Sequence, residues 1–258
     1  MAIDLFSVSG YALALLFFVA AFAYSSVGLG GGSSYTALMA IVGLNPLAIP
    51  LVSLSLNLLV TSVASLNFIR SKHTRIKLVL PFLLSSMPMA YWGGSLLLPK
   101  RLFYLLLLIS LVLVAIRIYA WKDTRIQISF SQRIQTTIAL ISGAILGLLA
   151  GIVGIGGGIF LVPLILILGL GTEKEAAACG ALFIWLNSAV GLLARLQHNA
   201  INLADYVPLI VAVLLGGTLG SFMGAFHFSP KMMEKILGAI IILAIILLSR
   251  KVLLSYGL

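Results

Sequence analysis

Long apolar stretches, separated by short polar ones, recur along the whole chain. Most run for about 20 residues, the length that an α-helix needs to cross roughly 30 Å of hydrocarbon. Their apolar residues are continuous and do not alternate with polar ones, as they do in the strands of a membrane β-barrel. The pattern therefore predicts an all-α integral membrane protein. The predicted segments are 4–27, 33–44, 47–69, 78–97, 102–121, 134–153, 159–170, 175–196, 206–226 and 232–253.

A pattern of five segments occurs twice, in the same order and with similar relative lengths. Short matches support an internal duplication: RSKHTRI at 70–76 resembles RLQHNAI at 195–201, and LPKR at 98–101 resembles SPKM at 229–232. We therefore divide the chain into three parts. These are a first transmembrane repeat at 1–121, a cytoplasmic linker at 122–133 and a second transmembrane repeat at 134–258.

The second segment of each repeat is short. Residues 33–44 and 159–170 would form helices of roughly 18 Å, too short to span a bilayer alone. On this length argument we expect about eight spanning helices plus two half-helices that follow glycine-rich loops. The alternative is ten spans, arranged as inverted repeats of five. The positive-inside rule gives the same excess of basic residues on the cytoplasmic side for both, so it does not choose between them.

Composition narrows the class of protein further. The 258 residues are 62% hydrophobic and 9% charged, whereas a soluble domain has about 25% charged residues. The net charge of +10 lies mostly between apolar segments, where the positive-inside rule places it, so we predict no nucleic-acid partner. A single cysteine, Cys179, excludes an internal disulfide and a multi-cysteine metal site. Because the three histidines are also scattered, we expect no metal and no cofactor.

The acidic residues all lie near segment ends or in loops. None falls in the middle of an apolar segment, where proton relays and cation sites in membranes place their carboxylates. This distribution disfavours a cation pump. No clustered carboxylates, metal ligands or Ser/His/Asp set indicate an enzyme, and we expect the chain not to be one.

A glycine-rich motif, G-x-G-G-G, precedes each short segment. Irregular backbone at membrane depth must line a cavity or be enclosed by protein, and a helix that starts there presents free N–H groups that bind anions. Broken helices at matching places in two repeats indicate a transporter's substrate site. Close helix packing on small residues is the competing interpretation. The predicted anion-binding glycines are Gly28, Gly30, Gly31, Gly32, Gly154, Gly156, Gly157 and Gly158.

Polar side chains near these loops complete the predicted substrate site. Asn57 and Thr61 are four residues apart and share one helix face, and their polar groups suit the oxygens of a small oxyanion. Cationic residues just beyond an apolar segment would gather anions at the mouth of the site. Hydrogen bonding between helices and snorkelling of the cations to the membrane surface are the alternatives. The predicted side chains are Ser33, Ser34, Tyr35, Asn57, Thr61, Asn187, Ser188, Arg195 and His198.

Three sequence features resemble the TauE/SafE sulfite exporters, also called toluenesulfonate uptake permeases. They are the duplicated glycine motif, GIGGGIFLVPL from Gly154, and CGALFIWLNSAVGLLARLQHNAI from Cys179. The resemblance covers essentially the whole chain and implies a bacterial inner-membrane carrier for small sulfur oxyanions. Two features depart from the family pattern: Ala37 replaces a proline after the first loop, and Gly180-Ala181 replaces a Thr-Ser pair.

Together, the residues and the resemblance predict a multi-pass secondary transporter in the cell inner membrane. We expect it to export small sulfur-containing oxyanions, such as sulfite or organosulfonates. An anion channel of the same architecture is the alternative. The predicted partners are the anionic substrate and the lipid bilayer, and a homo-oligomer is left open. Because serines and Tyr35 flank the first loop, we expect selectivity to depend more on that loop than on the second.

Overall fold

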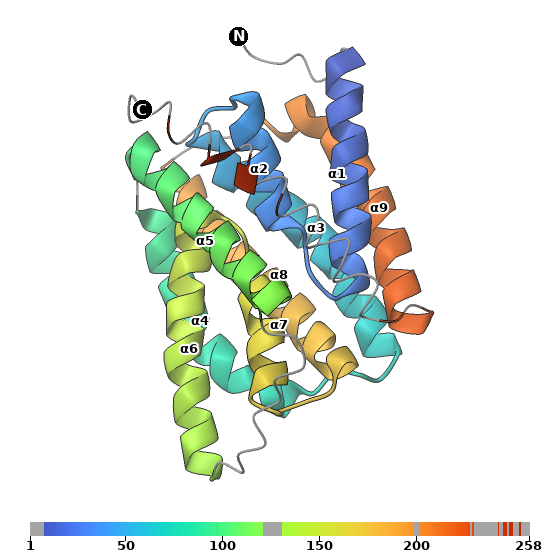
Figure 1. Ribbon diagram of the computed structural model, residues 1–258, viewed down its shortest axis with the longest axis vertical. Helices are drawn as coiled ribbons and strands as arrows, with labels where there is room; N and C mark the ends of the chain where they lie inside the picture. The colour runs from blue at the N-terminus through green and yellow to red at the C-terminus, as the bar shows by residue number, and fades with distance from the viewer. Residues whose placement is uncertain are drawn as a thin grey trace.

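A computed structural model describes residues 8–96, 98–120, 131–198 and 202–227, with residue 229 and scattered positions between 242 and 253. All regular structure in the described residues is helical (Figure 1). The helices are α1 (Val8–Ser26), α2 (Gly32–Val42), α3 (Ala48–Arg70), α4 (Ile76–Ser95), α5 (Lys100–Ala120), α6 (Gln132–Val153), α7 (Gly158–Ile167), α8 (Glu173–Leu196), the 3-10 turn η1 (Leu203–Tyr206) and α9 (Val207–Phe226).

The described helices begin and end within a few residues of the apolar segments predicted from the sequence. The two short segments form the short helices α2 and α7, each directly after its glycine loop. Four stretches, α3, α6, α8 and Leu203–Phe226, are long and apolar enough to cross a membrane. The predicted segment 232–253 lies largely outside the described residues.

The outer surface of the helix bundle is apolar. Large side chains on several helices are exposed, among them Leu84 at 64%, Ile141 at 59% and Phe222 at 50%. Continuous apolar exposure of this kind marks a surface that another apolar phase covers, and lipid chains supply that phase here. The predicted all-α membrane class is therefore confirmed for the described residues.

Helices α1, α3 and α9 run in one direction. Along α3, Val60 lies against Gly217, and Asn67 donates a hydrogen bond to Ser221 further along α9. Successive residues of α1 likewise meet successive residues of α9, and in order these contacts are Phe18 with Gly216, Phe22 with Gly220 and Ser26 with Gly224. The three helices are therefore parallel.

Helices α4, α6 and α8 run in the opposite direction. Helix α8 is antiparallel to α3, because Trp185 donates to Ser62 whereas Gly191, further along α8, lies near the earlier residue Leu54. Helix α4 is parallel to α8, with Gly94 against Gly191 near their last turns. Helix α6 follows α4 in register, and the contacts in order are Phe82 with Gly143, Ser86 with Gly147 and Ala90 with Gly151.

These directions decide how each short helix is connected. Because α1 and α3 are parallel, residues 27–47 must carry the chain back to the level at which α1 began. Residues 154–172 do the same between α6 and α8. The eight-span arrangement expected from segment length requires α1 and α3 to be antiparallel. The described helices instead have the directions of the ten-span alternative.

The helix pairs that are in contact in one half of the chain have equivalents when the two halves are exchanged. When α1–α4 are matched in order with α6–α9, the pair α4–α6 corresponds to α9–α1, and the pair α4–α8 to α9–α3. All four pairs are in contact, and Figure 1 shows α1 beside α9 and α4 beside α6. The central pair, α3 with α8, corresponds to itself. Matched helices run in opposite directions, as in inverted repeats.

Rows of glycine at every fourth position allow the closest of these helix contacts. Gly147 is one of them, and a Cβ at this position would run into the backbone of Ser86. This is the small-residue packing expected between membrane helices. The glycines that form this packing lie inside α6 and α9. Close packing on small residues is therefore not confined to the G-x-G-G-G loops.

Replacing Gly147 by leucine should lower the free energy of unfolding by about 1–3 kcal/mol, because the added side chain must push α6 away from α4. Thermal unfolding of the purified protein in detergent measures the change. The matched control is Ile145→Leu, which places leucine on the same helix at a position that is 54% exposed. Equal stability of the two variants would contradict the close packing of α4 and α6.

Candidate anion site at the junction of the glycine loops

The two glycine loops have related backbone geometry. Each opens with a left-handed glycine, Gly28 at φ 75° or Gly154 at φ 79°. Each closes with a left-handed glycine, Gly31 at φ 91° or Gly157 at φ 77°, which is the N-cap of the short helix that follows. The second loop has a further left-handed glycine, Gly156 at φ 74°. Residues other than glycine are strained at these backbone angles because their Cβ clashes with the backbone. The glycine requirement at the two N-caps is therefore a matter of backbone conformation.

Both short helices begin with uncapped N-termini. Neither Gly31 nor Gly157 has a side chain, and no side-chain hydrogen bond caps either helix. The first N–H groups of a helix have no partner within the helix, and about half a positive charge resides at that end. Gly32, the first residue of α2, lies against the backbone of Ile155 in the second loop. The N-terminal ends of α2 and α7 are therefore brought to one place.

Asn57 of α3 lies between the two loops. A Cβ added to Gly30 would be 2.5 Å from its Oδ1, and one added to Gly156 would be 3.2 Å from its Nδ2. A Cβ at Gly32 would also run into Nδ2. The side chain is fully buried, and neither its oxygen nor its nitrogen has a hydrogen-bond partner in the described structure. Glycine at these loop positions thus leaves room for the Asn57 amide.

Helix α8 contributes further unpaired polar groups from the other half of the chain. The Ser188 hydroxyl is fully buried, has no described partner and would be 3.0 Å from a Cβ on Gly156. Asn187 donates to the Phe183 carbonyl at 2.8 Å, while its own Oδ1 has no described partner. An unsatisfied buried polar group costs about 1–3 kcal/mol. A ligand with several oxygens would recover that energy.

Ser53 joins the two loops and was not predicted from the sequence. Its hydroxyl lies 2.8 Å from the carbonyl of Gly154 and 3.3 Å from that of Gly32, and donates to these acceptors. It is four residues before Asn57 and on the same helix face, which is the signal that identifies it. We call the cluster of Gly30, Gly32, Ser53, Asn57, Gly156 and Ser188 the loop junction.

The relatives of the chain identify its family. The family model described as sulfite exporter TauE/SafE matches residues 13–251. The chain belongs to the TauE/SafE sulfite exporter family. It is 35% identical over 236 residues to the probable membrane transporter protein y4hK of Sinorhizobium fredii, covering 90% of this chain and 95% of that protein.

A shorter match extends over part of the chain. It is 30% identical over 87 residues to the probable membrane transporter protein YunE of Bacillus subtilis, covering 34% of this chain and 32% of that protein. No solved structure gives a significant match. The resemblance to the TauE/SafE exporters and the class of membrane transporter, both predicted from the sequence, are therefore confirmed.

In this TauE/SafE protein, the predicted polar residues of α2 contact Tyr24, Phe17 and the first glycine loop, where the Tyr35 hydroxyl would be 2.6 Å from a Cβ on Gly31. The Ser33 and Ser34 hydroxyls bond to the Tyr24 hydroxyl at 2.8 and 3.1 Å. The Tyr35 ring stacks on Phe17 with centroids 5.1 Å apart, and its buried hydroxyl has no described partner. Tyr24 is thus a second residue that the sequence did not indicate.

Two further predicted residues, Thr61 and Gly158, contact residues next to the loop junction. Thr61 is buried one turn beyond Asn57 and donates to its carbonyl at 2.6 Å. Gly158 begins α7, and a Cβ there would collide with Ile184 of α8. Both residues therefore pack around the loop junction.

The predicted cationic residues of the TauE/SafE protein lie away from the junction. His198 is exposed beyond the end of α8. Arg195 is only 5% exposed and donates two hydrogen bonds to carbonyls at the end of α6. In the described residues, no three His, Cys, Asp or Glu side chains are grouped so that they could hold a metal.

Proposed function

We propose that the chain is a secondary transporter that exports small sulfur-containing oxyanions, such as sulfite or organosulfonates, and binds them at the loop junction. One observation carries the proposal: two helix N-termini and the unpaired polar groups of Asn57 and Ser188 meet at one buried place. The transporter class comes from the family, whose name also points to sulfite.

Each group at the junction has a role in this proposal. The Asn57 Nδ2 and the Ser188 hydroxyl donate to different oxygens of the anion. The first N–H groups of α2 and α7 donate from the glycine loops, and their helix dipoles supply positive charge without a cationic side chain. Ser53 keeps the loops together by its two hydrogen bonds. Ser33, Ser34 and Tyr35 remain predicted contributors to selectivity.

The helix directions support ten crossings, with each glycine loop and its short helix forming one crossing together. The two halves are then inverted repeats around a site near the membrane midplane, as in many secondary transporters. Rocking of one half against the other would expose the junction to each side in turn. With the linker cytoplasmic, the inside-negative potential favours anion exit by about 2.3 kcal/mol per charge per 100 mV.

Cysteine labelling separates the ten-span from the eight-span arrangement. With ten spans, an impermeant maleimide should label His198→Cys in intact cells and Glu173→Cys only after permeabilisation. Both native positions are exposed. Glu173 is the first residue of α8, and His198 lies just beyond its last residue. The native Cys179 is buried, so the unmodified protein is the control. The reversed labelling pattern would favour eight spans.

Transport is tested with purified protein in liposomes. Inward and outward fluxes of labelled sulfite and of toluenesulfonate should exceed those of empty liposomes. The flux should saturate with concentration, and an unlabelled anion on the opposite side should drive counterflow. Counterflow supports a carrier, whereas a non-saturating current without counterflow supports the anion-channel alternative. The absence of flux for every sulfur oxyanion tested would overturn the proposal.

A further inference from the structure

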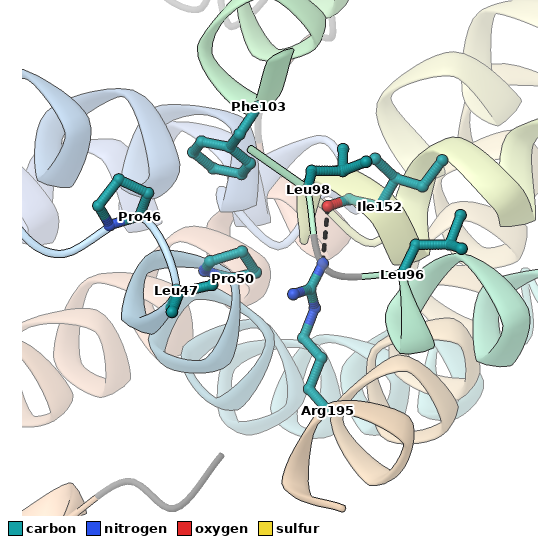
Figure 2. Close-up of a pocket in the computed structure, with 8 residues that line it drawn as sticks. All are labelled: Pro46, Leu47, Pro50, Leu96, Leu98, Phe103, Ile152 and Arg195. Carbon is teal, nitrogen blue, oxygen red and sulfur yellow. Dashed lines mark hydrogen bonds between the residues drawn. The ribbon is translucent and has the colours of Figure 1, made fainter. Parts of the chain in front are cut away.

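A small pocket lies at the end of α6, separate from the loop junction. Figure 2 shows the Arg195 side chain entering it from α8, with its guanidinium below Leu98 and Ile152. The other walls include Pro46, Pro50 and Phe103. Apart from Arg195, the side chains that line it are apolar. Among the described residues that line it, Arg195 alone carries a charge.

Arg195 is incompletely satisfied in this position. Its Nη2 donates to the carbonyls of Gly151 and Ile152 at 2.8 and 2.7 Å, at the negative end of the α6 dipole. Its Nε is buried without a described partner, and no described carboxylate forms an ion pair with it. A cap of α6 needs only the Nη2 group. The charge is therefore not neutralised, and the Nε donor is unpaired, in the described structure.

We propose that this pocket is a second anion-binding subsite, in which Arg195 holds the sulfur oxyanion after it leaves the loop junction. The inference rests on the proposed transport function. Helix α6 starts next to the cytoplasmic linker, so its other end, with Arg195, faces the extracytoplasmic side. An exported anion would therefore reach this pocket last.

One face of α3 connects the two sites. Pro50 lines the pocket, Ser53 binds both glycine loops, and Asn57 lies at the junction. Their spacing of three and four residues places them on the same helix face. Seven residues of helix correspond to about 10 Å. Pro50 also lies against Gly154, whose carbonyl accepts from Ser53 of the junction, so the pocket adjoins the start of the second glycine loop.

The guanidinium suits this role better than an ammonium would. A planar guanidinium can keep Nη2 on the two carbonyls while presenting other N–H groups to an oxyanion. Arg195 is only 5% exposed, and this burial strengthens the interaction between its charge and an anion. The bound charge would also offset that of Arg195, which no described carboxylate neutralises.

Equilibrium dialysis of the purified full chain against labelled sulfite, under argon, tests the subsite. The wild type should bind a second sulfite ion per chain. Leu98→Asp, which places a carboxylate beside Arg195, should lose that second ion and keep the first. Leu98→Asn has the same shape without the charge and should keep more of the second ion. Arg195→Gln provides an independent variant, and thermal unfolding shows that each variant is folded.

The central-site variant Asn57→Asp separates the two proposals. Loss of one ion in Leu98→Asp and of the other in Asn57→Asp would support both sites. A single ion, lost in Asn57→Asp but retained in Leu98→Asp and Arg195→Gln, would overturn the subsite and leave the proposed function standing. No sulfite binding in the wild type would overturn both.

Discussion

Asn57→Asp should reduce sulfite transport by more than about 100-fold while leaving the protein folded. Aspartate has the shape of asparagine but replaces the donor Nδ2 by an acceptor oxygen. A carboxylate about 4 Å from the bound anion would repel it by roughly 4 kcal/mol at the effective dielectric of a protein, and each 1.4 kcal/mol is a tenfold change in affinity. Initial rates in proteoliposomes, measured over a range of sulfite concentrations, give the loss.

Asn67→Asp is the matched control for this change. Asn67 lies on the same helix, about 15 Å further along, and its Nδ2 donates to Ser221 rather than facing the glycine loops. Its variant receives the same charge in the same helix but should retain transport within a few-fold. Equal loss in the two variants would assign the effect to charge in α3 generally and would contradict a binding role for Asn57.

The helices of this protein were readable from the sequence because lipid imposes strict lengths on apolar segments. Segment length and helix direction favour different span counts, and the first glycine loop shows where the two arguments differ. Only the 11 residues of α2 are helical, or about 17 Å. Residues 27–31 before it and 43–47 after it also belong to the connection between α1 and α3, which returns the chain because these two helices are parallel. An estimate from helix length alone omits the loop.

The candidate site was predicted in its parts but not in its arrangement. Glycines at matching places indicated both loops, and Asn57 and Ser188 were both expected to bind. Their meeting depends on the contact of α3 with α8, between segments more than 100 residues apart, which no local pattern encodes. Arg195 shows the same limit: its position beyond an apolar run indicated the surface, whereas contacts with α6 bury it.

The two halves supply different groups to the junction, although their helices pack in corresponding pairs. The loops are offset by 126 residues, and the same offset takes Asn57 to Phe183 and Ser62 to Ser188. The Ser62 hydroxyl is engaged with its own helix and with Trp185, whereas that of Ser188 is unpaired. The helix pairs of the two halves therefore correspond, whereas the polar groups that meet at the junction differ and make the site asymmetric. An asymmetric site can bind one small anion in one orientation.

Gly30→Ala should reduce sulfite transport by roughly 10–100-fold with little change in stability. Gly30 is not among the loop glycines with positive φ, so its backbone accepts alanine. The new Cβ would lie 2.5 Å from Asn57 Oδ1 and 3.0 Å from Thr61 Cγ2, which forces the Asn57 side chain to move. A lost hydrogen bond to a charged ligand costs about 1.5–3 kcal/mol, and this sets the expected range.

Gly191→Ala is the control for the added methyl group. Its Cβ would make an ordinary contact, 3.4 Å from Leu54 Cδ1, and a helical position favours alanine over glycine by about 1 kcal/mol. Transport should therefore persist, and the melting temperature should hold or rise. Wild-type transport by Gly30→Ala would show that transport does not depend on the present position of Asn57. It would favour the competing interpretation, in which the first glycine loop serves close helix packing. Loss of transport in Gly30→Ala alone, with both variants folded, would support a loop that keeps space for a substrate-binding amide.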